Sequence, residues 1–356
     1  MRLSRRIRKA LQAGLARVLG AVAAALARRP RLEAGNQPTR ILVIRVDERV
    51  GNVLLTTPLL RALQMARPEA RIEVLVAASK ASILTGIADT IPFEKKELFR
   101  NPIRFMRRLW ALRAARYDAV LDASHWHHFS FTSALLMGFI GAPLRITHER
   151  GAAARFATHA VAPPSAAEWE VATKLRLLAP LGHPSPEPPP LETGLGRGEA
   201  EARMRSWIDE AGLDPARLVG LAPGARKLDH RTPPELFAAL GDQAASRGHG
   251  IVVLWGPGEE SLVQAVQASC PSAIAAPPTN LDELAALMRA CRVVVANDTG
   301  PMHLAVACGA RTLGLFRGAD PIRWGHTPLG HAVVVVPEEA PEDALPPARE
   351  ALDRLL

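Results

Sequence analysis

Two blocks of alternating strand-like and helix-like segments constrain the fold of this chain more than any other feature of its sequence. The first block opens on the apolar run ILVIRV (41–46) and the helical pattern that follows it. Its segments lie in turn at 41–46, 53–66, 71–77, near 79–87, 101–115, 119–124 and 129–140. Strands that alternate with helices predict a parallel sheet covered by helices on both faces.

A stretch rich in proline and glycine, LGHPSPEPPPLETGLGRG (181–198), separates the two blocks. Its five prolines and four glycines exclude a regular helix or strand and indicate a linker. Beyond it the alternation resumes, with segments at 199–211, 218–223, 233–247, 250–256, 259–269, 281–290, 293–298, 301–308, 311–316 and 341–356. The 356 residues are enough for two domains.

The predicted architecture is therefore α/β, with two Rossmann-like, doubly wound domains that face a central cleft. We expect a basic amphipathic helix at 1–36 and a first domain at 37–180. The linker at 181–198 leads to a second domain at 199–340 and a C-terminal helix at 341–356. Ligands of such sheets bind at the carboxyl ends of the strands, so the loops that follow strands are the first places to search for a site.

The net charge of +9 lies in the N-terminal segment. Residues 1–32 contain nine basic and no acidic residues, and the rest of the chain has 35 of each. The body of the protein therefore has no basic signature of nucleic-acid binding. Apolar residues recur in this segment at helical spacing, at Leu3, Ile7, Leu11, Leu15, Val18, Val22 and Leu26.

A basic amphipathic helix of this kind favours the anionic inner face of a membrane. A signal peptide and a solvated helix packed on the body are the alternatives that remain open. A transmembrane helix is disfavoured, because residues 10–27 are dominated by Ala and Gly and contain Arg17. The three cysteines have no CxxC spacing, which points to a reducing compartment and away from a zinc site.

The segment VVVANDTGPMHLAVACG (293–309) gives the sharpest local signal. A buried strand runs into Asp298, Thr299 and Gly300, and a helix follows with His303 in its first turn. Glycine lets a ligand approach the backbone, and a helix N-terminus offers free N–H groups to an anion. A capped helix after a buried strand is the alternative without a ligand.

Two more loops of the second block follow predicted strands. In GLAPGARKLDHRTPPELFAAL (220–240) the loop carries Arg226, Lys227, His230 and Arg231, which suit a diphosphate or simply a solvated loop. In LWGPGEE (254–260), Glu259 suits either a ribose contact or the dipole of the helix that follows.

In the first block, the loop after 41–46 carries Asp47, Gly51 and Asn52, and HWHH (125–128) follows another strand. The histidines have no further cluster of ligands beside them, so a polar acceptor pocket is favoured over a metal site.

Together these segments resemble glycosyltransferase family 9, the ADP-heptose:lipopolysaccharide heptosyltransferases, from about residue 40 to about residue 330. The resemblance rests on six motifs that occur in the family's order. Their residues here are Arg45, Asp47, Gly51 and Pro58; Pro223, Gly224 and Ala225; Gly256, Pro257, Gly258 and Glu259; Asp298, Thr299 and Gly300; His303; and Gly318, Ala319, Asp320 and Pro321.

The resemblance implies a GT-B fold and an inverting transfer that needs neither a metal nor another cofactor. The donor would be ADP-heptose, held mainly by the C-terminal domain, with Asp298, Thr299 and Gly300 at the diphosphate and sugar and Glu259 near the nucleoside. The N-terminal domain would hold a lipid A–core acceptor and supply the base. The enzyme would work in the cytoplasm, peripheral to the inner membrane.

This sequence departs from the family pattern at two places. The family's presumed catalytic aspartate falls at Asn52, and an amide has no carboxylate to accept a proton. The family's phosphate-binding lysine falls at His230, where Arg226, Lys227 or Arg231 can supply the positive charge.

We therefore expect an active transferase whose base has moved to Asp47, with the His125–His128 cluster as a second source of a base. A nucleotide-sugar or glycolipid binder that has lost catalysis is the alternative. A GT-B epimerase or a phosphorylase-like enzyme is a third hypothesis, and a nucleotide sugar other than ADP-heptose stays open as the donor.

Overall fold

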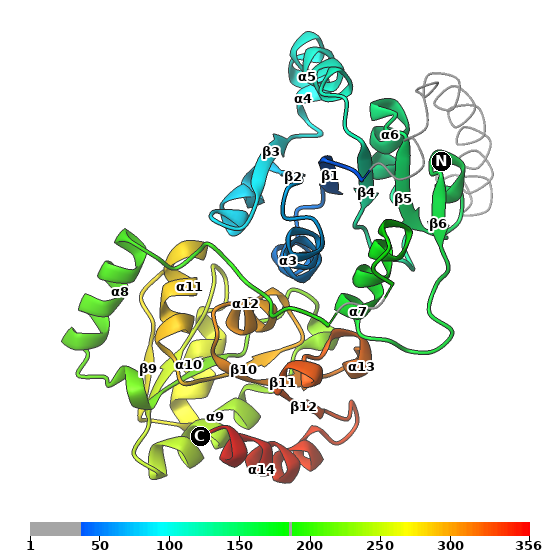
Figure 1. Ribbon diagram of the computed structural model, residues 1–356. Helices are drawn as coiled ribbons and strands as arrows, with labels where there is room; N and C mark the ends of the chain where they lie inside the picture. The colour runs from blue at the N-terminus through cyan, green and yellow to red at the C-terminus, as the bar shows by residue number, and fades with distance from the viewer. Residues whose placement is uncertain (1–36, 185–186) are drawn as a thin grey trace, which may run out of the picture. The chain divides into compact units, whose positions relative to one another are not determined.

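A computed structural model describes residues 37–184 and 187–356 of the chain (Figure 1). The helix predicted at 1–36 lies outside the described residues. The chain divides into two compact units. The first contains the described residues up to Glu48 together with Pro58–Pro189, and the second contains Arg49–Thr57 together with Pro190–Leu356.

The first unit is built on a six-stranded parallel sheet with the order β3-β2-β1-β4-β5-β6. Its strands are β1 (Arg40–Arg45), β2 (Arg71–Ala77), β3 (Asp89–Phe93), β4 (Ala119–Asp122), β5 (Leu144–His148) and β6 (His159–Val161). The central strand β1 is apolar at residues 41–44, between Arg40 and Arg45, because helices cover both faces of the sheet.

Helices of this unit connect its parallel strands, and α7 follows the last strand, β6. They are α3 (Thr57–Ala66), α4 (Glu97–Arg100), α5 (Pro102–Ala114), α6 (Phe131–Ile140) and α7 (Glu170–Leu175). Apolar side chains of α5 and α6 pack with those of β1 and β4 in one core, and α3 and α7 lie on the opposite side of the sheet (Figure 1).

The second unit repeats this plan, with a six-stranded parallel sheet in the order β12-β11-β10-β7-β8-β9. Its strands are β7 (Leu218–Ala222), β8 (Gly250–Val253), β9 (Ala273–Ala275), β10 (Val293–Asn297), β11 (Arg311–Phe316) and β12 (Ala332–Val335). Its helices are α2 (Val50–Leu54), α8 (Glu199–Glu210), α9 (Pro234–Ser246), α10 (Glu260–Ser269), α11 (Leu281–Ala290), α12 (Gly300–Ala307), α13 (Pro321–Trp324) and α14 (Leu345–Leu355).

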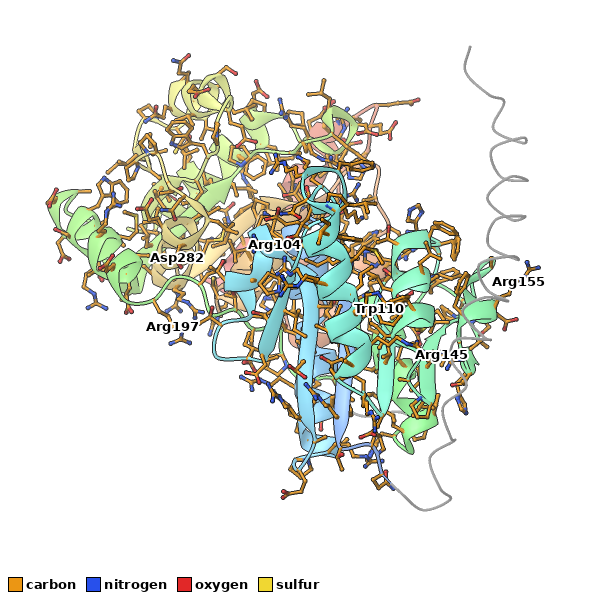
Figure 2. The ribbon with its side chains drawn as sticks, turned by 90° about the horizontal axis from the view of Figure 1, so that it is seen from above. Arg104, Trp110, Arg145, Arg155, Arg197 and Asp282 are labelled. Carbon is orange, nitrogen blue, oxygen red and sulfur yellow. The ribbon has the colours of Figure 1, made fainter. Side chains whose placement is uncertain are left out.

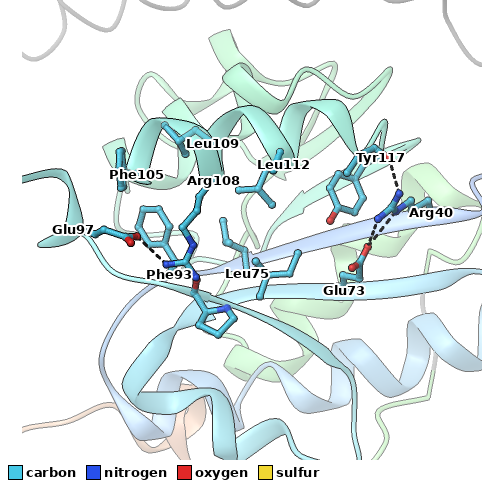
Figure 3. A pocket seen from close by; sticks show the side chains of 14 residues that line it. Arg40, Glu73, Leu75, Phe93, Glu97, Phe105, Arg108, Leu109, Leu112 and Tyr117 are labelled. Carbon is cyan, nitrogen blue, oxygen red and sulfur yellow. Dashed lines mark hydrogen bonds and ion pairs between the residues drawn. The ribbon is translucent and has the colours of Figure 1, made fainter. Parts of the chain in front are cut away.

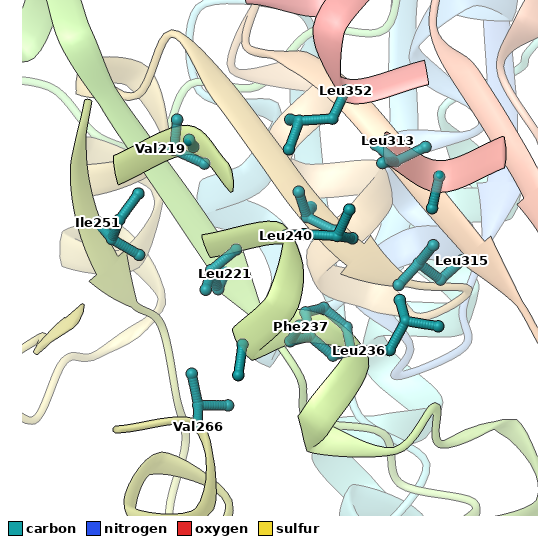
Figure 4. Packing of buried hydrophobic residues seen from close by; sticks show 14 of the residues in the cluster. Val219, Leu221, Leu236, Phe237, Leu240, Ile251, Val266, Leu313, Leu315 and Leu352 are labelled. Atoms are coloured by element: carbon teal, nitrogen blue, oxygen red, sulfur yellow. The ribbon is translucent and has the colours of Figure 1, made fainter. Parts of the chain in front are cut away.

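The core of the second unit lies between its sheet and helices α9, α10 and α14. Figure 4 shows Phe237 and Leu240 of α9 packed against Leu313 and other residues of the strands. Phe237, Leu240 and Leu313 are fully buried, and burial of each such side chain stabilises the fold by about 1.5–3 kcal/mol. This core holds the strands in register and so fixes the loops at their carboxyl ends.

Several elements differ from the sequence-based expectation. The single helix expected over 53–66 is two helices, α2 and α3, because Pro58 has no N–H to bond to Leu54. The helix expected near 79–87 is a 3-10 helix, Ala78–Leu84. The C-terminal segment begins as a 3-10 helix, Pro341–Ala344, before α14.

The linker sequence contains no helix or strand over residues 187–198. Among the helices that the structure describes, none combines the length and the apolar character needed to cross a bilayer. All three cysteines are buried free thiols.

Candidate active site

The junction between β10 and α12 carries the strongest sequence signal. Thr299 is the extended N-cap residue of α12, and its side chain makes no capping hydrogen bond. Pro301 lies in the first turn, where a missing N–H costs nothing. The first N–H groups of α12 are thus available to an anionic ligand.

Asn297, for which the sequence analysis proposed no role, organises this junction. It is fully buried at the end of β10. Its Nδ2 donates to the carbonyl of Pro223 at 2.7 Å, and its Oδ1 accepts from the backbone N–H of Thr232 at 3.1 Å. One amide therefore ties together the ends of the loop that runs from β7 to α9. The sequence signal for this role of Asn297 was a polar residue at the end of an otherwise apolar strand.

The loop from β7 to α9 brings its cations toward Asp298. Lys227 Nζ lies 3.4 Å from His230 Nε2, and His230 Nδ1 lies 3.9 Å from Asp298 Oδ2. Arg231 Nη2 donates to the carbonyl of Ala225 at 3.0 Å, and Arg226 is exposed. The structure thus groups a carboxyl, an imidazole and an ammonium beside the N-terminus of α12.

Burial raises the pKa of Asp298 to about 7, and the nearby Lys227 ammonium opposes that rise. A carboxyl with such a pKa changes its charge near neutral pH. The side chain can therefore donate a hydrogen bond below pH 7 and accept hydrogen bonds above it.

Glu259 lies against the backbone of the Pro223–Ala225 turn. Its Oε2 accepts from the N–H of Gly256 at 2.9 Å, and a Cβ placed on Gly224 would lie 2.2 Å from Glu259 Oε1. The Glu259 carboxylate thus packs directly on Gly224, and this contact brings the two predicted motifs together.

Asp320 has a local structural role. It is exposed, and its Oδ1 caps α13 by accepting from the N–H groups of Ile322 at 3.0 Å and Arg323 at 3.4 Å. The preceding Gly318 has a φ of +67°, and a Cβ there would lie 3.3 Å from the carbonyl of Asp229. The loop after β11 therefore runs beside the cationic loop.

The short helix α2 packs on α12 within the second unit. A Cβ on Gly51 would lie 2.6 Å from Cδ2 of His303. The His303 ring is fixed by a 2.8 Å hydrogen bond between its Nδ1 and Nε2 of His326, and burial lowers the pKa of His303 to about 4. Asn52 is half-buried in α2, and its backbone carbonyl accepts a hydrogen bond from Thr56 Oγ1 at 2.9 Å. Asn52 thus belongs to the unit that carries the α12 loop.

Asp47 belongs to the first unit, where it pairs with the buried end of β1. Arg45 is 1% exposed, and its Nη2 lies 3.0 Å from Asp47 Oδ2 and 3.0 Å from His125 Nε2. Its Nη1 donates to the carbonyl of Ala123 at 2.6 Å. The Asp47 side chain keeps 36% exposure, so a carboxylate oriented by Arg45 remains open to solvent.

His125 is a neutral imidazole held on both sides. Because Arg45 can only donate, His125 Nε2 accepts, and His125 Nδ1 donates to the carboxylate of Glu170. Burial, together with Lys174 and Arg45, keeps the pKa of His125 well below its usual value, although Glu170 opposes this. Both ring nitrogens are engaged, which makes His125 a poor general base.

Glu170 and Lys174 of α7 were missed by the sequence analysis. Lys174 Nζ donates to Glu170 Oε1 at 3.0 Å and to the carbonyl of Ala123 at 3.1 Å, and both side chains are fully buried. Burial lowers the pKa of Lys174 to about 8, and Glu170 opposes that shift. The i,i+4 spacing of Glu170 and Lys174 can be read from the sequence. Their burial depends on the tertiary fold and cannot be read from it.

A second buried pair, Asp122 with Arg150, lies at the ends of neighbouring strands. Arg150 also donates to the carbonyls of Ser124 and His125, each at 3.0 Å. The turn that carries His125 is therefore held by Arg150, which follows β5, as well as by α7.

A cavity of about 260 Å³ lies in the first unit between α5 and strands β1–β3 (Figure 3). Leu75, Phe93 and Leu112 line it, and ion pairs of Arg40 with Glu73 and of Arg108 with Glu97 stand at its ends. None of the predicted site residues lines this cavity, so it is separate from the candidate site.

Two Rossmann-like units in one chain, with polar loops at the carboxyl ends of the strands, define the GT-B class of glycosyltransferases. The family model for glycosyltransferase family 9 (heptosyltransferase) matches residues 106–346. The chain belongs to this family and is a glycosyltransferase, as its sequence motifs predicted.

Individual relatives agree with this family. The chain is 27% identical over 290 residues to lipopolysaccharide heptosyltransferase 3 of Escherichia coli, an alignment that covers 77% of this chain and 82% of the relative.

Two solved structures share the fold. The family 9 glycosyltransferase from Veillonella parvula DSM 2008 has a TM-score of 0.75 and 21% identity, with 92% of this chain and 99% of that chain covered. The E. coli heptosyltransferase WaaC with ADP has a TM-score of 0.70 and 20% identity, with 89% and 100% covered.

The predicted site residues thus fall into two groups. One group gathers in the second unit, around Asp298 and the start of α12, and it includes Gly51 and Asn52 through α2. The other group, Asp47 with His125, gathers around Arg45 in the first unit.

Proposed function

We propose that this glycosyltransferase moves a heptose from ADP-heptose to a lipid-linked core oligosaccharide of lipopolysaccharide, at the cytoplasmic face of the inner membrane. The donor and acceptor classes are supported by the family and by the names of the relatives. The observation that carries the proposal is the group of Lys227, His230 and Asp298 beside the N-terminus of α12. Fixed N–H donors and cations of this kind suit a leaving diphosphate.

The reaction we propose is a single displacement. The acceptor hydroxyl oxygen forms a bond to the anomeric carbon, the bond from that carbon to the diphosphate oxygen breaks, and ADP leaves with the electron pair. Attack opposite the leaving group inverts the anomeric configuration. The cations of the β7–α9 loop and the N–H groups of α12 take up the negative charge of ADP, so the proposed step needs no metal.

Asp47 is the base in this proposal. It is a partly exposed carboxylate, whereas both nitrogens of His125 are engaged and Asn52 has no carboxylate. The ion pair with Arg45, at 3.0 Å, fixes the direction of the Asp47 carboxylate. A weak base suffices when the hydroxyl loses its proton as the new bond forms.

A donor screen with product analysis tests the proposal. Thermal unfolding is followed with ADP-, UDP- and GDP-sugars, since a ligand that binds the native state raises the transition temperature. We expect ADP-heptose to give the largest rise, and its incubation with the glycolipid acceptor to yield ADP and an acceptor heavier by one heptose. A rise confined to UDP-sugars, or release of free or isomerised sugar, would overturn the assignment.

A further inference from the structure

An apolar stripe runs along the solvent side of α4 and α5. Phe99 is 86% exposed, Ile103 75%, Met106 41% and Trp110 55%. With Leu98, these residues make up five of the ten exposed large apolar side chains in the part of the chain that the structure describes. Scattered exposed apolar residues need no explanation, but a concentration on one surface indicates a partner.

The spacing of Ile103, Met106 and Trp110 places them on one face of α5. Positions 103, 106 and 110 recur within α5 at intervals of three and four, the period of one helical face, and Phe99 lies in α4 just before it. Another face of α5 supplies Leu112 to the core, with Phe105 and Leu109 packed against it. The outer stripe thus lies on a different face of α5 from the residues that pack in the core.

The stripe is held in a fixed shape. Asn101 caps α5 by accepting from the N–H of Arg104 at 3.0 Å, with Pro102 in the first turn. The Trp110 ring meets Phe139 of α6 edge to face, with 5.3 Å between centroids. Figure 2 shows Arg104 and Trp110 on this helix. A partner therefore meets a preformed surface.

Positive charge surrounds the stripe. Residues 94–116 contain eight basic and two acidic residues. The nearer acid, Glu97, is only 12% exposed and is paired with Arg104 at 3.0 Å and Arg108 at 2.8 Å. Residues 33–356 carry 35 charges of each sign in total, so the part of this span outside residues 94–116 is net negative and the excess of positive charge falls in residues 94–116.

We propose that the outer surface of α4 and α5, residues 95–110, docks on an anionic lipid bilayer. Apolar side chains, a tryptophan and long basic side chains on one helix suit the boundary between headgroups and acyl chains. The same charges disfavour two other occupants. The first is the N-terminal segment of this chain, since residues 1–32 carry nine basic and no acidic residues and would be repelled by a basic surface. The second is another copy of the chain, since a two-fold contact would place this basic surface against itself. The proposal does not depend on the identity of the sugar donor.

Co-sedimentation of the full chain with vesicles tests this surface. The vesicles contain phosphatidylcholine alone or phosphatidylcholine mixed with phosphatidylglycerol. One variant, Phe99→Ser with Ile103→Ser, removes the apolar contact, and a second, Arg100→Glu with Arg107→Glu, reverses the charge. Met65→Ser, at a side chain with 77% exposure on α3, and Arg155→Glu, at an exposed arginine of the same unit, are the matched controls.

We expect the wild type to bind the anionic vesicles, and each double variant to lose about tenfold in affinity. Both controls should bind as the wild type does, and every variant should keep its unfolding temperature. Equal binding by the double variants would show that another segment holds the membrane and would overturn the proposal. A change in oligomeric state in the Ser double variant with unchanged vesicle binding would assign the surface to a second copy and would overturn it as well.

Discussion

Asp298 is the site residue whose charge responds to pH in the working range. Burial raises its pKa to about 7, so it is largely neutral at pH 6 and largely ionised at pH 8. In the proposed complex the ADP diphosphate lies beside it. An anion bound there favours the protonated carboxyl, and binding should therefore take up a proton.

We predict that ADP binds the wild type more weakly as pH rises from about 6 to about 8, by at most about tenfold per pH unit for one linked proton. ADP also titrates in this range, so the Asp298→Asn variant is the reference. Isothermal titration calorimetry at several pH values should show a steeper dependence for the wild type than for the variant. Parallel curves would mean that Asp298 does not face the diphosphate.

At the scale of elements, helix α7 holds the β1 and β4 ends through one buried ion pair. Removing a single partner leaves an uncompensated charge in the interior. We predict that Lys174→Met lowers the free energy of unfolding by about 3–5 kcal/mol, measured by urea denaturation. Adding Glu170→Gln to that variant should recover part of the loss, because no buried charge then remains unpaired.

The exposed pair Glu201 and Arg205 on α8 is the matched control, since it has the same i,i+4 spacing at 3.7 Å and more than half of each side chain is exposed. Arg205→Ala should cost less than about 1 kcal/mol. Equal losses in Lys174→Met and Arg205→Ala would contradict the structural role given to α7.

The elements also show what sequence patterns can and cannot predict. The central strands β1, β2, β7, β10 and β11 were predicted because burial on both faces makes them predominantly apolar. The edge strands β6 and β9 have three residues each, too short to show a period. The site loops followed from strand ends, whereas the buried pairing of Glu170 with Lys174 depends on tertiary packing.

At the scale of the whole molecule, each unit buries neutral histidines. Burial lowers the pKa of His148 to about 3 and that of His303 to about 4, and it also lowers the pKa of His125 and His326. In the unfolded chain these groups have pKa values of about 6.5. The unfolded state therefore binds more protons below pH 6.5, and the fold loses stability as pH falls.

We predict that the unfolding temperature falls between about pH 7 and about pH 5. The pKa of Asp298 is raised in the fold, so this group stabilises the fold as pH falls over the same range. It is a single group, however, and the four histidines named above act in the other direction. His148 is buried, and neither of its ring nitrogens has a hydrogen-bond partner among the described residues. His148→Phe should make the pH dependence shallower. A dependence unchanged by His148→Phe would show that this histidine keeps an ordinary pKa in the fold.

The central claim is that this family member is an active transferase whose base is Asp47, with an amide at position 52. The most direct test is the kcat for ADP release from ADP-heptose in the presence of the glycolipid acceptor. Asp47→Asn should lower kcat by about 100-fold or more and leave ADP affinity unchanged, while Asn52→Ala should stay within a few-fold of the wild type. Full activity in Asp47→Asn, or an equal loss in Asn52→Ala, would contradict the account.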